Sequence, residues 1–262
     1  MIDFLKESTF AVNDVIRTAW DILKKEYLSI AGIGLMMFVT WNLSSFMALY
    51  FGEINIGVNL FMAFIFILLY VGLQLTLFKY ILKILDENDV HVTVQNSLPS
   101  RKQVLFFLLG TLYFIICIVL VYLLIGILLL PFVYTGISVN IIAQIAISTG
   151  IIGMLITWVR ISFFPFFIID RNTWPFQSIR FSLAITRGNF TKLLLLLIFF
   201  AIFHLLSLYL NYAGYPMISA LVSIVNSFLI VPLSSVAIAV AYRKMMNEYV
   251  GDADPDIIHN LI

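Results

Sequence analysis

The amino-acid sequence predicts an all-α membrane protein with six transmembrane helices in three hairpins and two amphipathic helices at the cytoplasmic interface. Three observations predict this fold class. The 262-residue chain is 62% hydrophobic and only 11% charged, whereas soluble domains are about half apolar and about a quarter charged. Six apolar stretches have the length of a membrane span. Lys and Arg are absent from every second connection between these stretches, as the positive-inside bias requires.

A bilayer core about 30 Å thick needs about 20 apolar residues in a helix. The six stretches that meet this length are 28–51, 56–84, 104–134, 137–169, 193–210 and 217–242. Several are longer than the minimum, which predicts tilt or extension into the interface. We expect a single transmembrane domain over residues 1–262. Its parts are an amphipathic segment (1–27), four spans (28–169), an interfacial helix (170–192), two spans (193–245) and a tail (246–262).

The basic residues predict the orientation of the chain. They lie before the first span, around the second connection, in the fourth connection and after the sixth span, apart from Arg160 inside the fourth span. The first, third and fifth connections are short and contain no Lys or Arg. The positive-inside bias therefore places both termini and the two longer connections in the cytoplasm.

Two cytoplasmic segments have the spacing of amphipathic helices. Their apolar positions are Val12, Val15, Ile16, Ala19 and Leu23 in the first segment, and Phe176, Ile179, Leu183 and Phe190 in the second. Asn172 or Thr173 is placed to cap the second helix, Pro175 suits its first turn and Gly188 suits its end. Both helices are expected to lie in the cytoplasmic interface.

One stretch of about thirty residues resembles a pattern found in bacterial six-span integral membrane proteins. The residues that carry the resemblance are Arg160, Pro165, Asp170, Ser182, Arg187, Gly188 and Asn189, followed by a Leu-rich span. That group includes uncharacterised YciC-like proteins and the membrane region attached to some glycerophosphodiester phosphodiesterases. The resemblance implies a bacterial inner-membrane protein. These 262 residues contain no soluble phosphodiesterase domain, so that activity is not expected.

Arg160 is the ionisable residue that most needs an explanation, because an Arg at the bilayer centre costs at least about 2.5–3.5 kcal/mol. In one interpretation Arg160 lies at the cytoplasmic boundary and extends its charged end into water. Pro165 then disturbs the helix, and residues 163–169 lie along the interface. In the other it faces inward and helps to form a basic pocket for a lipid phosphate. The candidate contacts for anionic lipid or a partner are Arg160, Arg171, Arg180, Arg187 and Lys192.

A second candidate site consists of polar residues inside the spans, namely Gln74, Asn140, Gln144, His204 and Asn226. His204 lies near the midplane, where a lone His could carry protons, but no Asp or Glu lies inside a predicted span. The structural interpretation is that Asn226, Asn140 or Gln144 bonds to a neutral His204 and holds helices together. If the five residues instead converge on one cavity, a small-solute or ion transporter is the alternative function.

Small residues mark predicted helix contacts within or between chains. Ser219, Ser223 and Ser227 recur every four positions in the sixth span, and Ala146, Thr149, Gly150 and Gly153 are similarly spaced in the fourth. Such spacing lets helix backbones approach closely, either within the chain or in a homodimer. Pro232 should kink the sixth span or free a carbonyl. That kink is either structural or a hinge beside a cavity.

The sequence nominates no catalytic constellation. It contains no phosphate-binding glycine loop, no HExxH and no GxSxG, and its one cysteine, Cys117, lies inside a span. We therefore expect no enzyme activity, no metal and no cofactor. The expected partners are membrane lipids and either another membrane protein or a second copy, with no nucleic acid. The leading hypothesis is a non-enzymatic component of the bacterial inner membrane that binds lipid or a partner.

Overall fold

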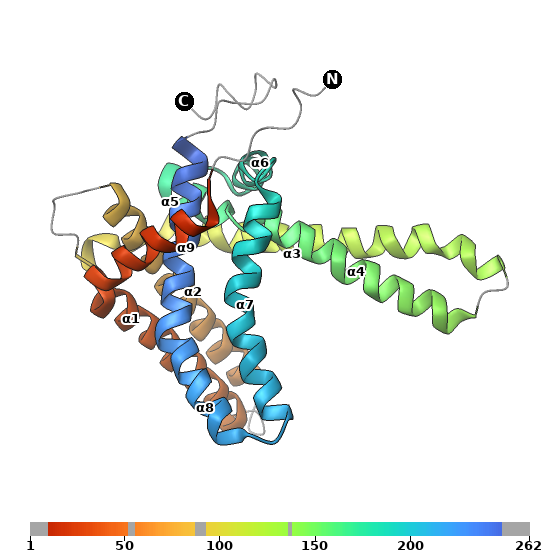
Figure 1. The fold of residues 1–262 in the computed structure, drawn as a ribbon, viewed down its shortest axis with the longest axis horizontal. Coiled ribbons are helices and arrows are strands. Elements are labelled where there is room, and N and C mark those ends of the chain that lie inside the picture. Colours follow the sequence, from red (N-terminus) through yellow and green to blue (C-terminus); the bar gives the residue numbers. More distant parts are fainter. Residues whose placement is uncertain (1–9, 52–55, 87–92, 136–137, 248–262) are drawn as a thin grey trace. The chain divides into compact units, whose positions relative to one another are not determined.

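The structure is a computed structural model of the 262-residue chain, and it describes residues 10–51, 56–86, 93–135 and 138–247. All regular elements in these residues are helical, so the chain is an all-α membrane protein as predicted (Figure 1). Within the described residues, six helical stretches are long and apolar enough to cross a membrane: Val12–Tyr50, Ile56–Asp86, Arg101–Tyr134, Val139–Arg171, Phe190–Tyr212 and Pro216–Asn247. Many of their large apolar side chains are exposed, which suits contact with lipid. The protein is therefore a multi-pass membrane protein.

The described residues form two compact units. Unit 1 contains residues 105–190, and unit 2 contains residues 10–104 together with 191–247. The prediction of a single transmembrane domain concerns the chain as a whole and stays a prediction.

Unit 2 is built around three helices. Helix α1 (Val12–Phe51) packs against α2 (Ile56–Asp86) and α9 (Val231–Asn247), and α2 also packs against α9. A 3-10 turn (Gln95–Ser97) follows α2. The remaining elements of this unit are α7 (Phe190–Tyr212), α8 (Pro216–Val225) and a π-helical turn (Asn226–Ile230) that joins α8 to α9.

The core of unit 2 lies at the end of the helices where its basic residues are found. Helix α9 contributes the fully buried Val236, Ala237 and Ala241. These small side chains let the backbones of neighbouring helices come close. At the same end, Arg243 of α9 forms an ion pair with Asp86 at the end of α2.

The first amphipathic segment is confirmed as helical over its described part, and it forms the beginning of α1. It joins the first span through a kink at Glu26, whose backbone is non-helical (φ −114°, ψ 23°). Val15, Ala19 and Leu23 on its apolar side are buried inside unit 2. These three side chains therefore pack against protein, while the predicted position of this helix in the interface stays a prediction.

Unit 1 contains α3 (Arg101–Leu129) from residue 105 onward, a 3-10 segment (Leu130–Thr135) and α4 (Val139–Ile161). Helices α3 and α4 touch at small residues, as the spacing in the fourth span predicts. A Cβ atom on Gly150 would lie 2.9 Å from the Tyr122 ring, and one on Gly153 would lie 3.0 Å from Ile125. The glycines therefore allow this close approach, and a side chain at Gly150 would require the Tyr122 ring to shift.

The predicted span 137–169 is broken into two helices. Helix α4 ends at Ile161, and α5 (Phe164–Arg171) begins with Pro165 in its first turn. The break follows from Pro165, because its nitrogen carries no hydrogen for the carbonyl of Ile161. The side chains of residues 163–169 are buried in protein, and their predicted position along the interface stays a prediction. Gly110 of α3 makes room for them, since its missing Cβ would be 2.7 Å from the Phe164 ring.

The second amphipathic segment forms α6 (Pro175–Ile185), which packs against α4 and α5. Pro175 begins this helix as predicted, and Gly188 follows its end with a positive φ of 83°. The predicted side-chain cap is wrong, because Trp174 occupies the capping position without a capping bond. Asn172 instead ends α5 in the left-handed conformation (φ 51°), which asparagine tolerates better than most residues.

Candidate functional site

A buried hydroxyl network joins α6 to the end of α4. The Ser182 hydroxyl donates to the carbonyl of Arg160 (2.7 Å) and accepts from the backbone N–H of Phe163 (3.1 Å). Thr186 donates to the same Arg160 carbonyl (3.3 Å) and to the carbonyl of Ser182 (2.8 Å). Ser182 and Thr186 are fully buried. The break between α4 and α5 leaves backbone groups at the helix ends without hydrogen-bond partners inside a helix. The hydroxyls of this network supply partners for them.

Arg160 takes part in this junction through its side chain as well. Its guanidinium donates from Nη2 to the carbonyl of Leu183 in α6 (2.9 Å). Its Nε is buried and makes no hydrogen bond within the described residues. The structure therefore gives Arg160 a structural contact with α6, and its position at the membrane boundary stays a prediction.

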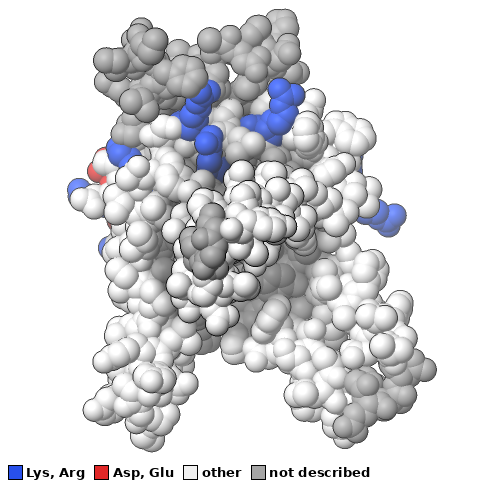
Figure 2. Space-filling view, turned by 90° about the vertical axis from the view of Figure 1, so that its right-hand side faces the viewer, with Lys and Arg blue, Asp and Glu red and all other residues white. Residues whose placement is uncertain are grey.

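The other predicted cations divide between the two units. Arg171 and Arg180 are exposed in unit 1, as are the aromatic residues Trp174 and Phe176, and Arg187 is half-buried in the same unit. Phe176 and Arg180 are four residues apart on α6 and so share one face of that helix. On the face drawn in Figure 2, Lys and Arg occupy a small part of a mostly uncharged described surface.

Lys192 belongs to unit 2 and has a local role. Its ammonium group donates to the carbonyl of Phe10 (2.5 Å) and lies 5.9 Å from the centre of the Phe10 ring. Lys192 thereby fixes the start of α7 to the beginning of the described chain.

Of the five predicted intramembrane polar residues, two are seen to bond to each other. The Asn226 amide nitrogen lies 3.3 Å from His204 Nδ1, which is one of the pairings expected from the sequence. Gln74 lies half-buried on α2 in the same unit. Asn140 and Gln144 are exposed on α4 in unit 1. Transport through a shared polar cavity stays a prediction.

The His204–Asn226 pair continues a row of serine contacts between α7 and α8. Ser207 lies 2.6 Å from Ser223 through their hydroxyl oxygens, and Ser219 donates to the Ser207 carbonyl (2.8 Å). Ser219 and Ser223 are thus at a helix contact, as their four-residue spacing predicts. Hydroxyl pairs of this kind are a common means of joining helices in a membrane.

The π-helical turn before Pro232 carries the freed carbonyl that the sequence predicts. In an α-helix the Phe228 carbonyl would accept from the nitrogen of Pro232, which has no hydrogen. The Tyr27 hydroxyl of α1 donates to this carbonyl instead (3.1 Å). Glu26, the residue before Tyr27, accepts a hydrogen bond from the hydroxyl of the buried Tyr80 in α2 (2.8 Å). The kink in α1 is therefore attached to both neighbouring helices.

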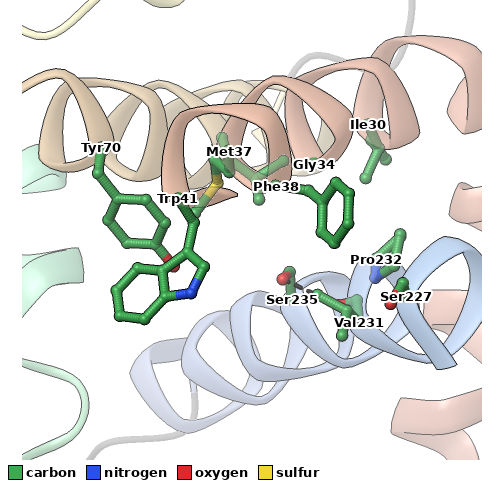
Figure 3. A pocket seen from close by; sticks show the side chains of 11 residues that line it. Ile30, Gly34, Met37, Phe38, Trp41, Tyr70, Ser227, Val231, Pro232 and Ser235 are labelled. Atoms are coloured by element: carbon green, nitrogen blue, oxygen red, sulfur yellow. Dashed lines mark hydrogen bonds between the residues drawn. The ribbon is translucent and has the colours of Figure 1, made fainter. Parts of the chain in front are cut away.

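A cavity of about 230 Å³ lies between α1, α2 and the π-turn–α9 segment (Figure 3). Its walls are mainly apolar, and Pro232 is one of its lining residues. Pro232 therefore lies beside a cavity, while a kink or hinge at this proline stays a prediction. Trp41 of α1 and Tyr70 of α2 meet at one end with their ring centres 6.1 Å apart.

Sequence reasoning missed most of this cavity. Only Pro232 and Ser227 had been singled out, and none of the five predicted intramembrane polar residues lines it. Gly34 is an interior glycine of the first span, but so is Gly32, which does not line the cavity, so a glycine in the sequence does not locate it. Within the described residues, no group of three His, Cys, Asp or Glu residues is placed to hold a metal ion.

Comparison with known proteins finds no matching family model, no matching curated protein and no matching solved structure. The resemblance to bacterial six-span membrane proteins therefore stays a prediction.

Proposed function

We propose that the protein is a non-enzymatic component of the bacterial inner membrane that binds anionic lipid headgroups at the α5–α6 platform. We define this platform as the outward side of residues 170–187, which includes Arg171, Trp174, Phe176, Arg180 and Arg187. In the proposed orientation, the platform and both termini face the cytoplasm, since the basic residues lie at this end of the spans.

The observation that carries the proposal is the two-sided character of α6. Its inner side is held by the buried hydroxyls of Ser182 and the adjacent Thr186. Its outer side exposes Phe176 and Arg180, with Trp174 exposed just before the helix. A rigid helix that offers an aromatic ring and a guanidinium side by side suits the headgroup region of a bilayer.

The chemistry of the platform favours phosphate as the ligand. A guanidinium presents several N–H donors in a plane and matches two phosphate oxygens at once. Each basic side chain near an anionic leaflet contributes about 1 kcal/mol. Three arginines would therefore contribute about 3 kcal/mol, which corresponds to roughly a hundredfold in affinity.

The test uses the full-length protein in detergent with added phosphatidylglycerol, and native mass spectrometry counts the lipids retained. Replacement of Arg171, Arg180 and Arg187 by Gln should reduce retention strongly. Arg160 is left in place, because its contact with Leu183 supports the fold. A matched control replaces three exposed cations of unit 2 by Gln, namely Arg17, Lys25 and Arg101.

The control removes the same charge and should retain more phosphatidylglycerol than the platform variant. Equal retention by the platform variant and the unaltered protein would contradict the proposal. Equal loss in both variants would also contradict it, because net charge would then explain the binding without any particular site.

A further inference from the structure

The cavity of unit 2 runs along the apolar part of the first span. Its lining residues on α1 extend from Ile30 to Trp41. At 1.5 Å per residue these positions lie about 8 Å and about 24 Å along the helix from Lys25. The cavity therefore begins inside the basic end of the unit and continues into the apolar part of the span.

The length of the cavity corresponds to one lipid chain. The distance from Ile30 to Trp41 along α1 is about 16 Å. Half of a hydrocarbon core about 30 Å thick is about 15 Å. An acyl chain in one leaflet covers this same depth, so a chain lying along α1 would contact the cavity over its whole length.

The walls suit a flexible apolar occupant. Gly34 leaves part of the wall without a side chain, and an added Cβ there would have no atom within 4 Å. Met37 offers a flexible and polarisable side chain that adapts to an irregular neighbour, while Phe38 and Leu77 complete the apolar surface. Figure 3 shows Gly34, Met37 and Phe38 of α1 across from Val231 and Pro232.

One polar group of the lining already has a hydrogen-bond partner in the protein. Ser235 donates to the carbonyl of Val231 (3.0 Å) within its own helix. Among the residues that the structure describes, no Lys, Arg, Asp or Glu lines the cavity. At this depth hydrocarbon is the surrounding solvent, and an empty cavity would lose dispersion contacts that a lipid chain can supply.

We propose that the cavity between α1, α2 and α9 binds a single acyl chain of a membrane lipid, which lies along α1 from Ile30 to Trp41. The site is separate from the α5–α6 platform, which lies in the other unit and recognises a headgroup. The cavity recognises the chain, so the kind of headgroup should matter little. Pro232 and the Tyr27–Phe228 hydrogen bond hold one wall in the shape that leaves the space open.

The test uses the full-length protein in lipid nanodiscs that contain a phospholipid with a photoreactive diazirine in the middle of one acyl chain. After irradiation, peptide mass spectrometry locates the labelled residues. We expect labelling on the peptides that contain residues 30–41 and 227–235. The same chain on phosphatidylethanolamine or on phosphatidylglycerol should label these peptides to a similar extent.

A matched pair of glycines makes the test specific. Gly34→Phe places a ring in the cavity, whereas Gly32→Phe adds the same ring to α1 at a position that does not line it. An added Cβ has no atom within 4 Å at either position. Labelling of 227–235 should fall about tenfold in Gly34→Phe, equivalent to about 1.4 kcal/mol, and should persist in Gly32→Phe.

Three results would overturn the assignment. Gly34→Phe could label as strongly as the unaltered protein, or both glycine variants could lose labelling equally. A photoreactive residue at position 38 could also give cross-links between two protein chains, which would identify a second copy as the occupant. The platform variant tested above should keep its acyl-chain labelling, so the failure of one proposal can be distinguished from the failure of the other.

Discussion

Ser182→Ala should destabilise the protein by disconnecting α6 from α4. The hydroxyl that is lost bonds to two backbone groups, the N–H of Phe163 and the carbonyl of Arg160. Loss of a partner for a buried polar group costs about 1–3 kcal/mol. The Arg160 carbonyl keeps its 3.3 Å bond from Thr186, so most of the cost arises at Phe163. We expect the free energy of unfolding to fall by about 2 kcal/mol.

The assay is a reversible unfolding titration with SDS in mixed micelles, followed by circular dichroism. Ser178→Ala is the matched control, because Ser178 is equally buried on the same helix. Its hydroxyl donates to the Trp174 carbonyl, which also accepts the backbone N–H of Ser178 and so keeps a partner. It also lies 2.6 Å from the hydroxyl of Thr173, which is half-exposed and can bond to water after the substitution. The control should therefore cost only about 0.5–1 kcal/mol. Equal stability of the two variants would refute the structural role given to Ser182.

Two further predictions concern unit 2 and the orientation of the chain. Tyr27→Phe should lower the thermal unfolding midpoint, because the Phe228 carbonyl loses a hydrogen bond worth about 1 kcal/mol. Tyr70→Phe is the control. An equal decrease of the midpoint in both variants would count against the Tyr27–Phe228 contact. The orientation can be tested in a protein in which Cys117 is replaced by Ala. Arg180→Cys, at an exposed position, should react with an impermeant maleimide only after the cells are opened. Tyr212→Cys, at another exposed position, should react from outside intact cells. The reverse pattern would invert the proposed topology.

Several features of the fold could be predicted from local sequence. The length and hydropathy of the apolar stretches predict the six candidate spans, because a helix that satisfies its own backbone must be about 20 residues long to cross a bilayer. Pro165 predicts the break that separates α4 from α5, and Pro175 marks the beginning of α6. These effects depend on the chemistry of one residue and its nearest neighbours in the chain.

The candidate sites were less accessible to the same reasoning. The sequence identifies Arg160 as unusual because an arginine inside an apolar span costs free energy of insertion. Its contact with Leu183 depends on how α6 folds back against α4. Likewise, His204 had three possible amide partners in the sequence, and the structure pairs it with Asn226. A polar residue in a span shows that a partner is needed, and the rotation of each helix about its axis decides which partner it meets.

The sequence by itself determined that this protein is helical, crosses a membrane several times and keeps its basic residues near alternate span ends. Those properties follow from composition and short-range spacing. The tertiary structure decided that Tyr27 bonds to a carbonyl 201 residues away, that Ser182 joins α6 to the end of α4, and that α1, α2 and α9 leave an apolar cavity beside Pro232. Each of these depends on how helices distant in the chain are rotated and packed, and hydrophobicity along one helix does not encode that arrangement.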